Sequence, residues 1–281
     1  MNKACVETAS IAEIRIYPIK SLPGLKLEQA AVRDNGALAD DRRWAIFDSD
    51  GRVVNGKRTP RIHALDAHFA AGPEQVVLVD RAGSREAAFQ LTRQAAEAAA
   101  WLSEFFGFPV ELREDVERGF PDDRDAPAPT VVSTATLEAV AGWFPPLELE
   151  QIRRRFRANI ELSCPAAFWE DCLFGEPGQV VRFDAGEVEL AGVNPCQRCV
   201  VPTRHSESGE IYPHFAATFS QRRQATLPDW ATASRFNHFY RLAVNTRGVG
   251  PQRGRHLRVG DRVCVRGIEP SDACQAATSR A

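Results

Sequence analysis

"RWAIFDSDGRVVNG", residues 43–56, predicts the class of the fold more clearly than any other part of the sequence. An apolar run at residues 44–47 leads into the turn-forming residues Asp-Ser-Asp-Gly, and Val53 and Val54 follow the turn. Two short apolar runs on either side of a glycine-containing turn are typical of a β-hairpin. The stretch therefore predicts antiparallel β-structure.

Short strands of the same kind are expected along the whole chain, because brief apolar or alternating runs recur between turn residues. They fall at residues 12–18, 25–32, 75–80, 87–91, 159–162, 180–183, 187–190, 199–203, 240–245 and 262–267. The sequence therefore predicts a mostly β chain with some α-helix, in the α+β class.

Three helices are expected among these strands. Residues 94–107 place apolar side chains at helical spacing, and Gly107 is the expected C-terminal stop. Ser133 is the expected N-cap of a second helix at residues 134–143, because its hydroxyl accepts a hydrogen bond from a first-turn amide. A third helical stretch is expected within residues 227–239, where the apolar period is poor.

A boundary between two packed halves is expected near "RGFPDDRDAPAPT", residues 118–130, which is rich in Pro and Asp and has no periodicity. We predict one domain over residues 1–118 and a second over residues 119–281. A chain of 281 residues is long enough for two domains of ordinary size.

The composition excludes several classes of function. The net charge of −2 argues against broad attraction to nucleic acid or to anionic membranes. No stretch has the 18 or more apolar residues of a membrane span. The seven cysteines are odd in number and widely spaced, which indicates a reducing compartment. We expect a cytoplasmic protein with no membrane anchor.

The stretch "NPCQRCVVPT", residues 194–203, holds a Cys-x-x-Cys pair. A zinc site needs four ligands and the pair supplies two, so no zinc is expected. A redox dithiol normally begins a helix, and here a β-type run follows. A thiol hydrolase would need a base such as His205 or His214, although His205 has the sequence context of a solvated turn residue. Two packed thiols remain an alternative, but Arg198 between Cys196 and Cys199 favours an anionic ligand.

Five separated stretches resemble one family, and they occur in its order. They are "YPIKS" at residues 17–21, "DRRW" at 41–44, "FRANI" at 156–160, "PCQRC" at 195–199 and "LRVGDRV" at 257–263. The chain resembles the MOSC-domain proteins that carry an N-terminal β-barrel domain, as in the amidoxime-reducing group. The resemblance implies an N-terminal β-barrel-like domain packed on a β-barrel MOSC domain.

The resemblance also implies a molybdenum cofactor, a pterin dithiolate with a terminal phosphate. By position, Cys199 corresponds to the metal ligand, with Arg198 beside it and Cys196 dispensable. A soft thiolate suits a metal that dithiolate sulfur already holds. The other residues that correspond to cofactor-binding positions are Lys20, Ser21, Arg42, Ser133, Thr136, Arg157 and Asn159.

These implied contacts have a physical rationale. A phosphate is well served by a lysine charge, an arginine fork and a hydroxyl, which Lys20, Arg42 and Ser21 offer. Arg157 and Asn159, two residues apart on an expected strand, would point to the same side and contact the pterin. The other arginines of "RRRF" are expected on a solvated helix face. For Ser133 and Thr136, helix capping is the alternative role.

The sequence departs from the family pattern in two places. Relatives often show Thr-Thr-Val-Asp after the cysteines, where this chain has Pro-Thr-Arg-His at residues 202–205. The family can also place a tyrosine at the cofactor, and here either Phe239 or Tyr240 occupies that neighbourhood.

The implied reaction is a two-electron oxygen transfer that reduces small N-hydroxylated compounds or N- and S-oxides. The alternative is a non-catalytic carrier of the molybdenum cofactor or of sulfur. After Cys199 only Cys264 and Cys274 follow, too few for an iron-sulfur cluster in this part of the chain. We therefore expect an external electron donor, either a ferredoxin-like protein or a flavin reductase.

Overall fold

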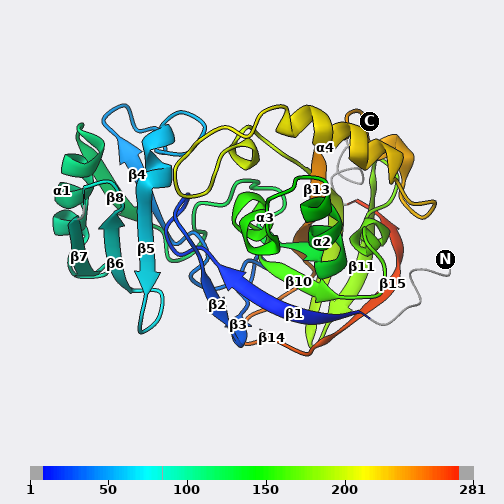
Figure 1. Cartoon of the computed structure of the whole chain (residues 1–281). Coiled ribbons are helices and arrows are strands. Elements are labelled where there is room, and N and C mark those ends of the chain that lie inside the picture. Colours follow the sequence, from blue (N-terminus) through cyan, green and yellow to red (C-terminus); the bar gives the residue numbers. More distant parts are fainter. Residues whose placement is uncertain (1–8, 84, 272–281) are drawn as a thin grey trace.

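The computed structural model describes residues 9–83 and 85–271, and these residues form a mostly β structure with four α-helices (Figure 1). The helices are α1 Ala95–Phe106, α2 Thr134–Gly142, α3 Leu149–Phe156 and α4 Phe215–Ala225. The strands are β1 Ala9–Ile16, β2 Leu25–Leu27, β3 Gln29–Ala31, β4 Trp44–Asp48, β5 Leu65–Phe69, β6 Gln75–Asp80, β7 Arg85–Gln90, β8 Val110–Glu114, β9 Ala128–Ser133, β10 Ile160–Ser163, β11 Gln179–Ala185, β12 Val188–Gln197, β13 Arg241–Gly248, β14 His256–Arg258 and β15 Arg262–Pro270.

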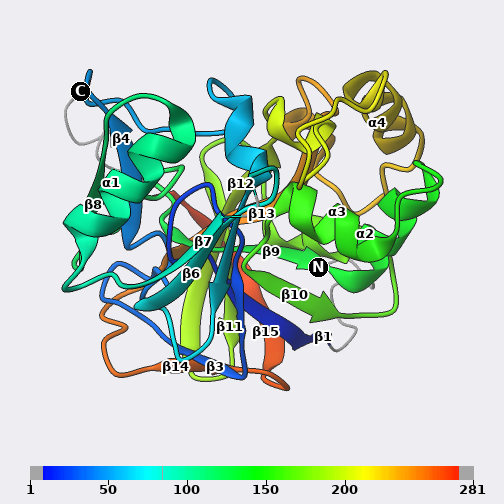
Figure 2. The same cartoon turned by 60° about the vertical axis from the view of Figure 1, so that its left-hand side comes forward.

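Seven strands close into a β-barrel, which confirms the predicted fold class. Their order is β10-β9-β13-β12-β11-β15-β1, and pairing of β1 with β10 closes the ring. Neighbours are antiparallel except β9 and β10, which run parallel. The barrel interior holds a buried apolar core that includes Ile14, Phe183 and Val244. Helices α2, α3 and α4 cover one side of the barrel (Figure 2).

A smaller lobe lies beside the barrel and contains the three-stranded sheet β5-β6-β7, the pair β4-β8 and helix α1 (Figure 1). Helix α1 buries Ala98, Leu102 and Phe105 in the core of this lobe. It ends at Gly107, whose left-handed backbone has φ +79°, a conformation that glycine adopts without steric cost. The predicted helix and its stop are confirmed.

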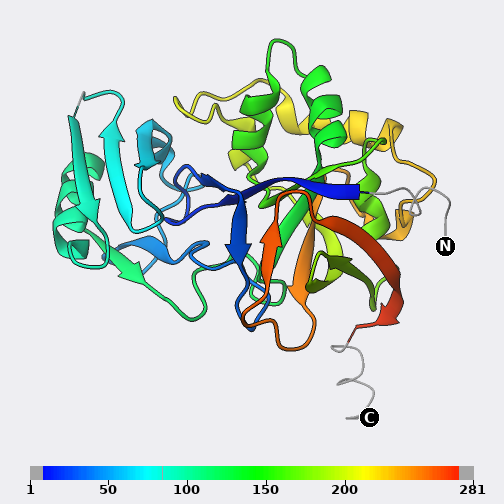
Figure 3. The same cartoon turned by 90° about the horizontal axis from the view of Figure 1, so that it is seen from below.

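Strands from before the predicted boundary pair with strands from after it. Strand β1 belongs to the barrel, and β3 pairs with β14 (Figure 3). The interlobe segment also begins before residue 118, since β8 ends at Glu114. The division into residues 1–118 and 119–281 stays a prediction.

The predicted hairpin forms its turn, but its first strand has a different main partner. Phe47 makes only an isolated bridge with Val53, whereas β4 pairs along its whole length with β8. The local sequence specifies the turn, and the distant strand supplies more backbone hydrogen bonds.

Two local predictions are wrong. Residues 199–203 are not a strand; Val201–Thr203 form the short 3-10 helix η4. Pro202 has no N–H to donate to a strand neighbour, which disfavours β-pairing there. The helical stretch expected within residues 227–239 contains only the short 3-10 helix Ala233–Arg235. Helix α4, which the sequence pattern did not predict, packs Phe215 and Phe219 against the α2 and α3 side chains.

Over residues 9–83 and 85–271, the helices are too short or too polar to cross a membrane.

Candidate functional site

A cavity of about 750 Å³ lies at the ends of barrel strands β9, β12 and β13, and the smaller lobe also contributes to its wall. Its volume is within the usual range for cofactor and small-molecule sites. The barrel contributes Thr130, Asn194 and Asn245, and the smaller lobe contributes Asn55 and Ile62. The cavity therefore joins segments that lie far apart in the sequence.

The wall of the cavity is strongly cationic, although the whole chain carries a net charge of −2. Among the described residues, three carboxylates line it, from Asp41, Asp122 and Asp123. The lysines and arginines that line it are Lys20, Arg42, Lys57, Arg118, Arg124, Arg155, Arg157, Arg198, Arg235 and Arg241. Such an excess of positive charge in a concave site favours an anionic ligand.

Most of the residues implied by the family resemblance meet in this cavity. Those that line it are Lys20, Ser21, Arg42, Arg157, Asn159, Arg198 and Cys199. The neighbour Arg43 does not line it; its guanidinium lies 4.4 Å from the Trp44 ring and pairs with Glu114. Ser133 and Thr136 are fully buried elsewhere.

Three of the lining residues have a left-handed backbone conformation, which residues other than glycine rarely adopt. The φ angles are +74° at Ser21, +50° at Arg42 and +54° at Arg157. Strained backbone conformations of this kind are common at functional sites, because the surrounding structure there enforces them. Arg157 is therefore not on a strand, as expected from the sequence; it is the C-cap of α3, and β10 begins only at Ile160.

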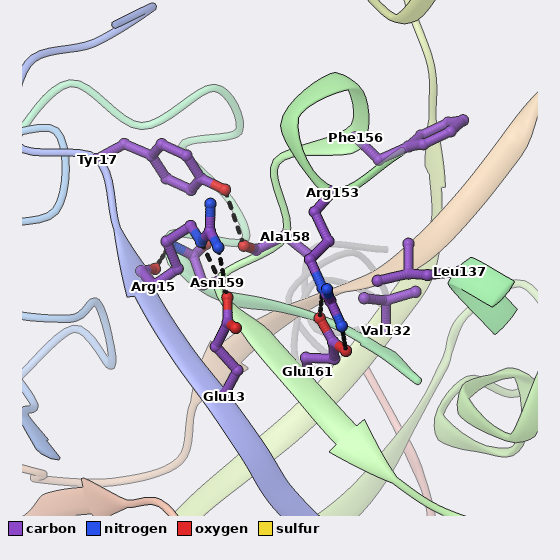
Figure 4. A pocket seen from close by; sticks show the side chains of 10 residues that line it. All are labelled: Glu13, Arg15, Tyr17, Val132, Leu137, Arg153, Phe156, Ala158, Asn159 and Glu161. Carbon is purple, nitrogen blue, oxygen red and sulfur yellow. Dashed lines mark hydrogen bonds and ion pairs between the residues drawn. The ribbon is translucent and has the colours of Figure 1, made fainter. Parts of the chain in front are cut away.

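Contacts around β1 fix the segment of Ala158 and Asn159, which directly follows Arg157 (Figure 4). The Tyr17 hydroxyl donates to the Ala158 carbonyl at 3.1 Å, and the side-chain amide of Asn159 donates to the Arg15 carbonyl at 3.0 Å. The Arg157 guanidinium stacks over the Tyr17 ring at 4.0 Å. Burial lowers the pKa of Arg157, because the charge is partly removed from water.

A second, small cavity of about 10 Å³ lies beneath this segment. Arg153 and Glu161 form a two-pronged ion pair in its wall, with both N–O distances 2.8 Å (Figure 4). This ion pair joins α3 to β10 on either side of Asn159. The space is too small for a substrate, and the contacts around it hold the wall of the larger cavity.

The two cysteines of the pair are free thiols with different surroundings. The Arg198 guanidinium lies 3.0 Å from Cys196 Sγ and also donates to the Phe156 carbonyl. Cys199 Sγ accepts a weak hydrogen bond from the Val201 amide at 3.5 Å. Arg198 therefore contacts the first thiol of the pair, not the second.

Arg155 was expected on a solvated helix face, and that prediction is wrong. Its side chain is 4% exposed and donates to the carbonyls of Pro202 and Arg204. These bonds join α3 to the chain that follows Cys199. A buried arginine inside a basic run has no separate sequence signal, because exposed neighbours such as Arg154 look the same.

Two further residues of the site were not found from the sequence. His63 lines the cavity, and burial together with Arg204 and Arg157 lowers its pKa to about 4, so its imidazole is neutral at neutral pH. Asp122 pairs with Lys20 at 2.8 Å. His205 accepts from the amides of its own turn, at Glu207 and Ser208, and does not line the cavity.

Of the two aromatic candidates, Tyr240 is the one near the cysteines. Its carbonyl accepts from the Arg198 amide at 3.0 Å, and burial raises the pKa of its hydroxyl, with the nearby Cys199 adding to the effect. Phe239 instead packs against the barrel core and stacks on Phe236. Neither ring lines the cavity.

Ser133 and Thr136 have the capping role that was their alternative. Ser133 Oγ accepts from the Thr136 amide at 3.1 Å at the start of α2. Thr136 Oγ1 donates to Glu170 at 3.0 Å and accepts from the Phe168 amide. The cluster holds α2 against the segment that carries Glu170.

Glu170 predicts a pH dependence of stability. Burial and the neighbouring Asp171 raise its pKa from 4.5 to about 7, so the folded chain favours the protonated form. The free energy of unfolding should therefore fall as the pH rises from about 4.5 through 7, by up to about 3 kcal/mol. Glu170→Gln should remove this decline and stabilise the protein at pH 8, as measured by urea denaturation.

The matched control for Glu170 is Glu138→Gln on the exposed face of α2, which should leave the pH dependence unchanged. Equal slopes of stability against pH in wild type and Glu170→Gln would contradict the assignment.

The described residues contain no group of three or more His, Cys, Asp or Glu side chains arranged to hold a metal ion. A metal at Cys199 would therefore need most of its ligands from a cofactor.

Comparison with known proteins gives two family matches and several relatives. The MOSC N-terminal beta barrel domain matches residues 8–105, and the MOSC domain matches residues 124–264. The molybdenum cofactor sulfurase of Drosophila grimshawi is 28% identical over 91% of this chain and 34% of the relative. The same enzyme of Drosophila melanogaster is 24% identical, with the same coverage. Mitochondrial amidoxime reducing component 2 of Bos taurus is 23% identical over 73% of this chain and 69% of the relative. The chain thus spans about a third of the length of the sulfurases.

Proposed function

This chain belongs to the MOSC family and carries the family's N-terminal beta barrel domain, and we propose that it is a molybdenum-cofactor-dependent oxidoreductase. It reduces N-hydroxylated compounds or N- and S-oxides, with Cys199 as the protein ligand of the metal.

One observation carries the proposal: the cationic cavity gathers a free thiol and anion-binding side chains from distant parts of the sequence. Cys199, Lys20, Arg42 and Arg157 all line it. The donor set fits the group, since thiolate suits a soft metal and the basic side chains suit a phosphate. The volume of about 750 Å³ is sufficient for a pterin-sized ligand.

Each residue has a separate part in holding the cofactor. Lys20, Ser21 and Arg42 would bind the phosphate, and Arg157 and Asn159 would contact the pterin. Cys199 would complete the sulfur ligands of the metal. When bound, the molybdenum cofactor supplies two-electron oxygen transfer, and the protein supplies orientation and electrostatics.

The protein side chains also control charge around the thiols. Arg198, Arg235 and Arg241 line the cavity; the Arg198 guanidinium contacts Cys196 Sγ at 3.0 Å, and Arg241 also interacts electrostatically with that thiol. Their positive charges add to the attraction of the cavity for an anionic ligand. Electrons would come from a separate reductase or ferredoxin-like protein, in a cytoplasmic setting.

The relatives also support a second candidate function. The sulfurases match this chain over 91% of its length, so a non-catalytic carrier of the cofactor or of sulfur would have the same fold. In that case Cys199 would hold the cofactor or a persulfide without substrate turnover.

Turnover of benzamidoxime with a chemical reductant separates the two functions. We expect the purified, cofactor-loaded protein to convert the amidoxime to the amidine, because a reductase needs only electrons and substrate once the cofactor is bound. Product formation is followed by chromatography, with heat-denatured protein and free cofactor as controls. Bound cofactor without conversion of any N-hydroxylated, N-oxide or S-oxide probe would favour the carrier.

A further inference from the structure

All three N–H donors of Lys20 are engaged by one short segment of the chain. The ammonium donates to the carbonyls of Phe120 at 2.8 Å and Pro121 at 3.1 Å, and it pairs with Asp122 Oδ1 at 2.8 Å. A lysine has three donors in total. A ligand anion therefore gains a direct bond to Lys20 only by replacing one of these partners.

Asp122 is an anion held by the same cations that would bind a phosphate. Its second carboxylate oxygen lies 3.9 Å from Arg42 Nε, and Arg157 also acts on it electrostatically. Desolvation within the cavity raises the pKa of Asp122, but the charges of Arg42 and Lys20 lower it by more. The resulting pKa is well below the usual range of an aspartate. The side chain is a carboxylate at neutral pH.

The backbone just before Asp122 is fixed, whereas the Asp122 side chain is accessible to solvent. The Phe120 amide donates to the Arg42 carbonyl at 2.8 Å, and the Phe120 ring meets Phe47 edge-on at 5.4 Å. The Asp122 side chain, by contrast, is 76% exposed. The two carbonyl contacts of Lys20 thus belong to an anchored backbone, and the third belongs to a side chain that can rotate away.

We propose that Asp122 is a specificity-determining residue of the cavity: its carboxylate occupies the anion site formed by Lys20 and Arg42, and a ligand binds there by displacing it. A ligand carboxylate would replace the single negative charge of Asp122 with another single negative charge, so it would gain little binding free energy. A terminal phosphate carries nearly two charges and three acceptor oxygens, so it gains more from the same cations. Asp122 therefore selects phosphate-bearing ligands over carboxylates. The inference rests on the proposed function only in identifying that phosphate as part of the cofactor.

Calorimetric titration of the purified full chain with inorganic phosphate and with acetate, at low ionic strength, tests the inference without any molybdenum. Asp122→Asn keeps the shape of the side chain and removes its charge. We expect it to bind phosphate about ten-fold more tightly than wild type, because a charged competitor has been removed. We also expect it to gain acetate binding that wild type lacks.

Asp123→Asn is the matched control, because Asp123 also lines the cavity but has no ion pair with Lys20 or Arg42. It changes the net charge of the cavity equally, and its phosphate affinity should stay within about two-fold of wild type. Equal or weaker phosphate binding by Asp122→Asn, including no measurable binding in either protein, would overturn the inference. An equal gain in phosphate affinity in Asp122→Asn and Asp123→Asn would also overturn the inference. A failed search for molybdenum would instead count against the proposed function alone.

Discussion

Replacing Cys199 with alanine is expected to lower the rate of amidoxime reduction by about 100-fold or more and to release the metal. Loss of a residue that only hydrogen-bonds to a metal ligand typically costs roughly 10–100-fold in activity or metal affinity, and loss of the ligand itself should cost more. Cys196→Ala should keep the metal and lose at most about ten-fold in rate. Both thiols are free and both line the cavity, so the two variants form a matched pair.

The surroundings of the two thiols make this contrast informative. The Arg198 guanidinium contacts Cys196 Sγ at 3.0 Å, and Cys199 Sγ accepts only a weak hydrogen bond from the Val201 amide at 3.5 Å, so these contacts alone do not single out Cys199. The family resemblance assigns the ligand to Cys199. Steady-state rates and molybdenum content measured on both variants decide between them. Metal retained in Cys199→Ala and lost in Cys196→Ala would reverse the assignment.

Replacing Gly192 with alanine is expected to destabilise the barrel by about 3 kcal/mol or more, because a side chain has no room there. A Cβ at Gly192 would lie 1.7 Å from the carbonyl oxygen of Leu173, a backbone atom in the buried 3-10 helix Trp169–Leu173. Gly192 lies on β12, the strand that also carries Cys196. Relief of the clash would move β12, so the variant should also lose ligand binding.

Gly267→Ala is the control, since it lies on barrel strand β15 and a Cβ there meets nothing within 4 Å. It should change the free energy of unfolding by less than about 1 kcal/mol. Urea denaturation of both variants gives the comparison. Similar stabilities for the two would contradict the close approach of β12 to Leu173.

Local sequence signals predicted the elements that depend on local interactions. Helix α1 carries its own apolar face and its own stop at Gly107, and β6 and β7 are two short runs around a turn. Helix α4 was missed because it buries Arg223 together with Phe215 and Phe219, so its inward face is not purely apolar. The partner of β4 was missed because β8 lies more than sixty residues along the chain.

The residues of the site also fall into those that the sequence identified and those that it did not. Lys20 and Cys199, which line the cavity, were singled out from the sequence because they lie in stretches that resemble the family when all five are taken together in order. Asp122 and His63 were missed because their roles depend on partners distant in the sequence, Lys20 for one and Arg204 and Arg157 for the other. Arg155 was misassigned because burial of one arginine in a run of three is decided by packing of α3.

Metal and pterin analysis of the wild-type protein, expressed in a host that makes the molybdenum cofactor, determines whether this chain binds that cofactor. We expect molybdenum and pterin in equal amounts, close to the protein concentration, with little zinc. Zinc bound in place of molybdenum, or protein that carries neither molybdenum nor pterin from such a host, would contradict it.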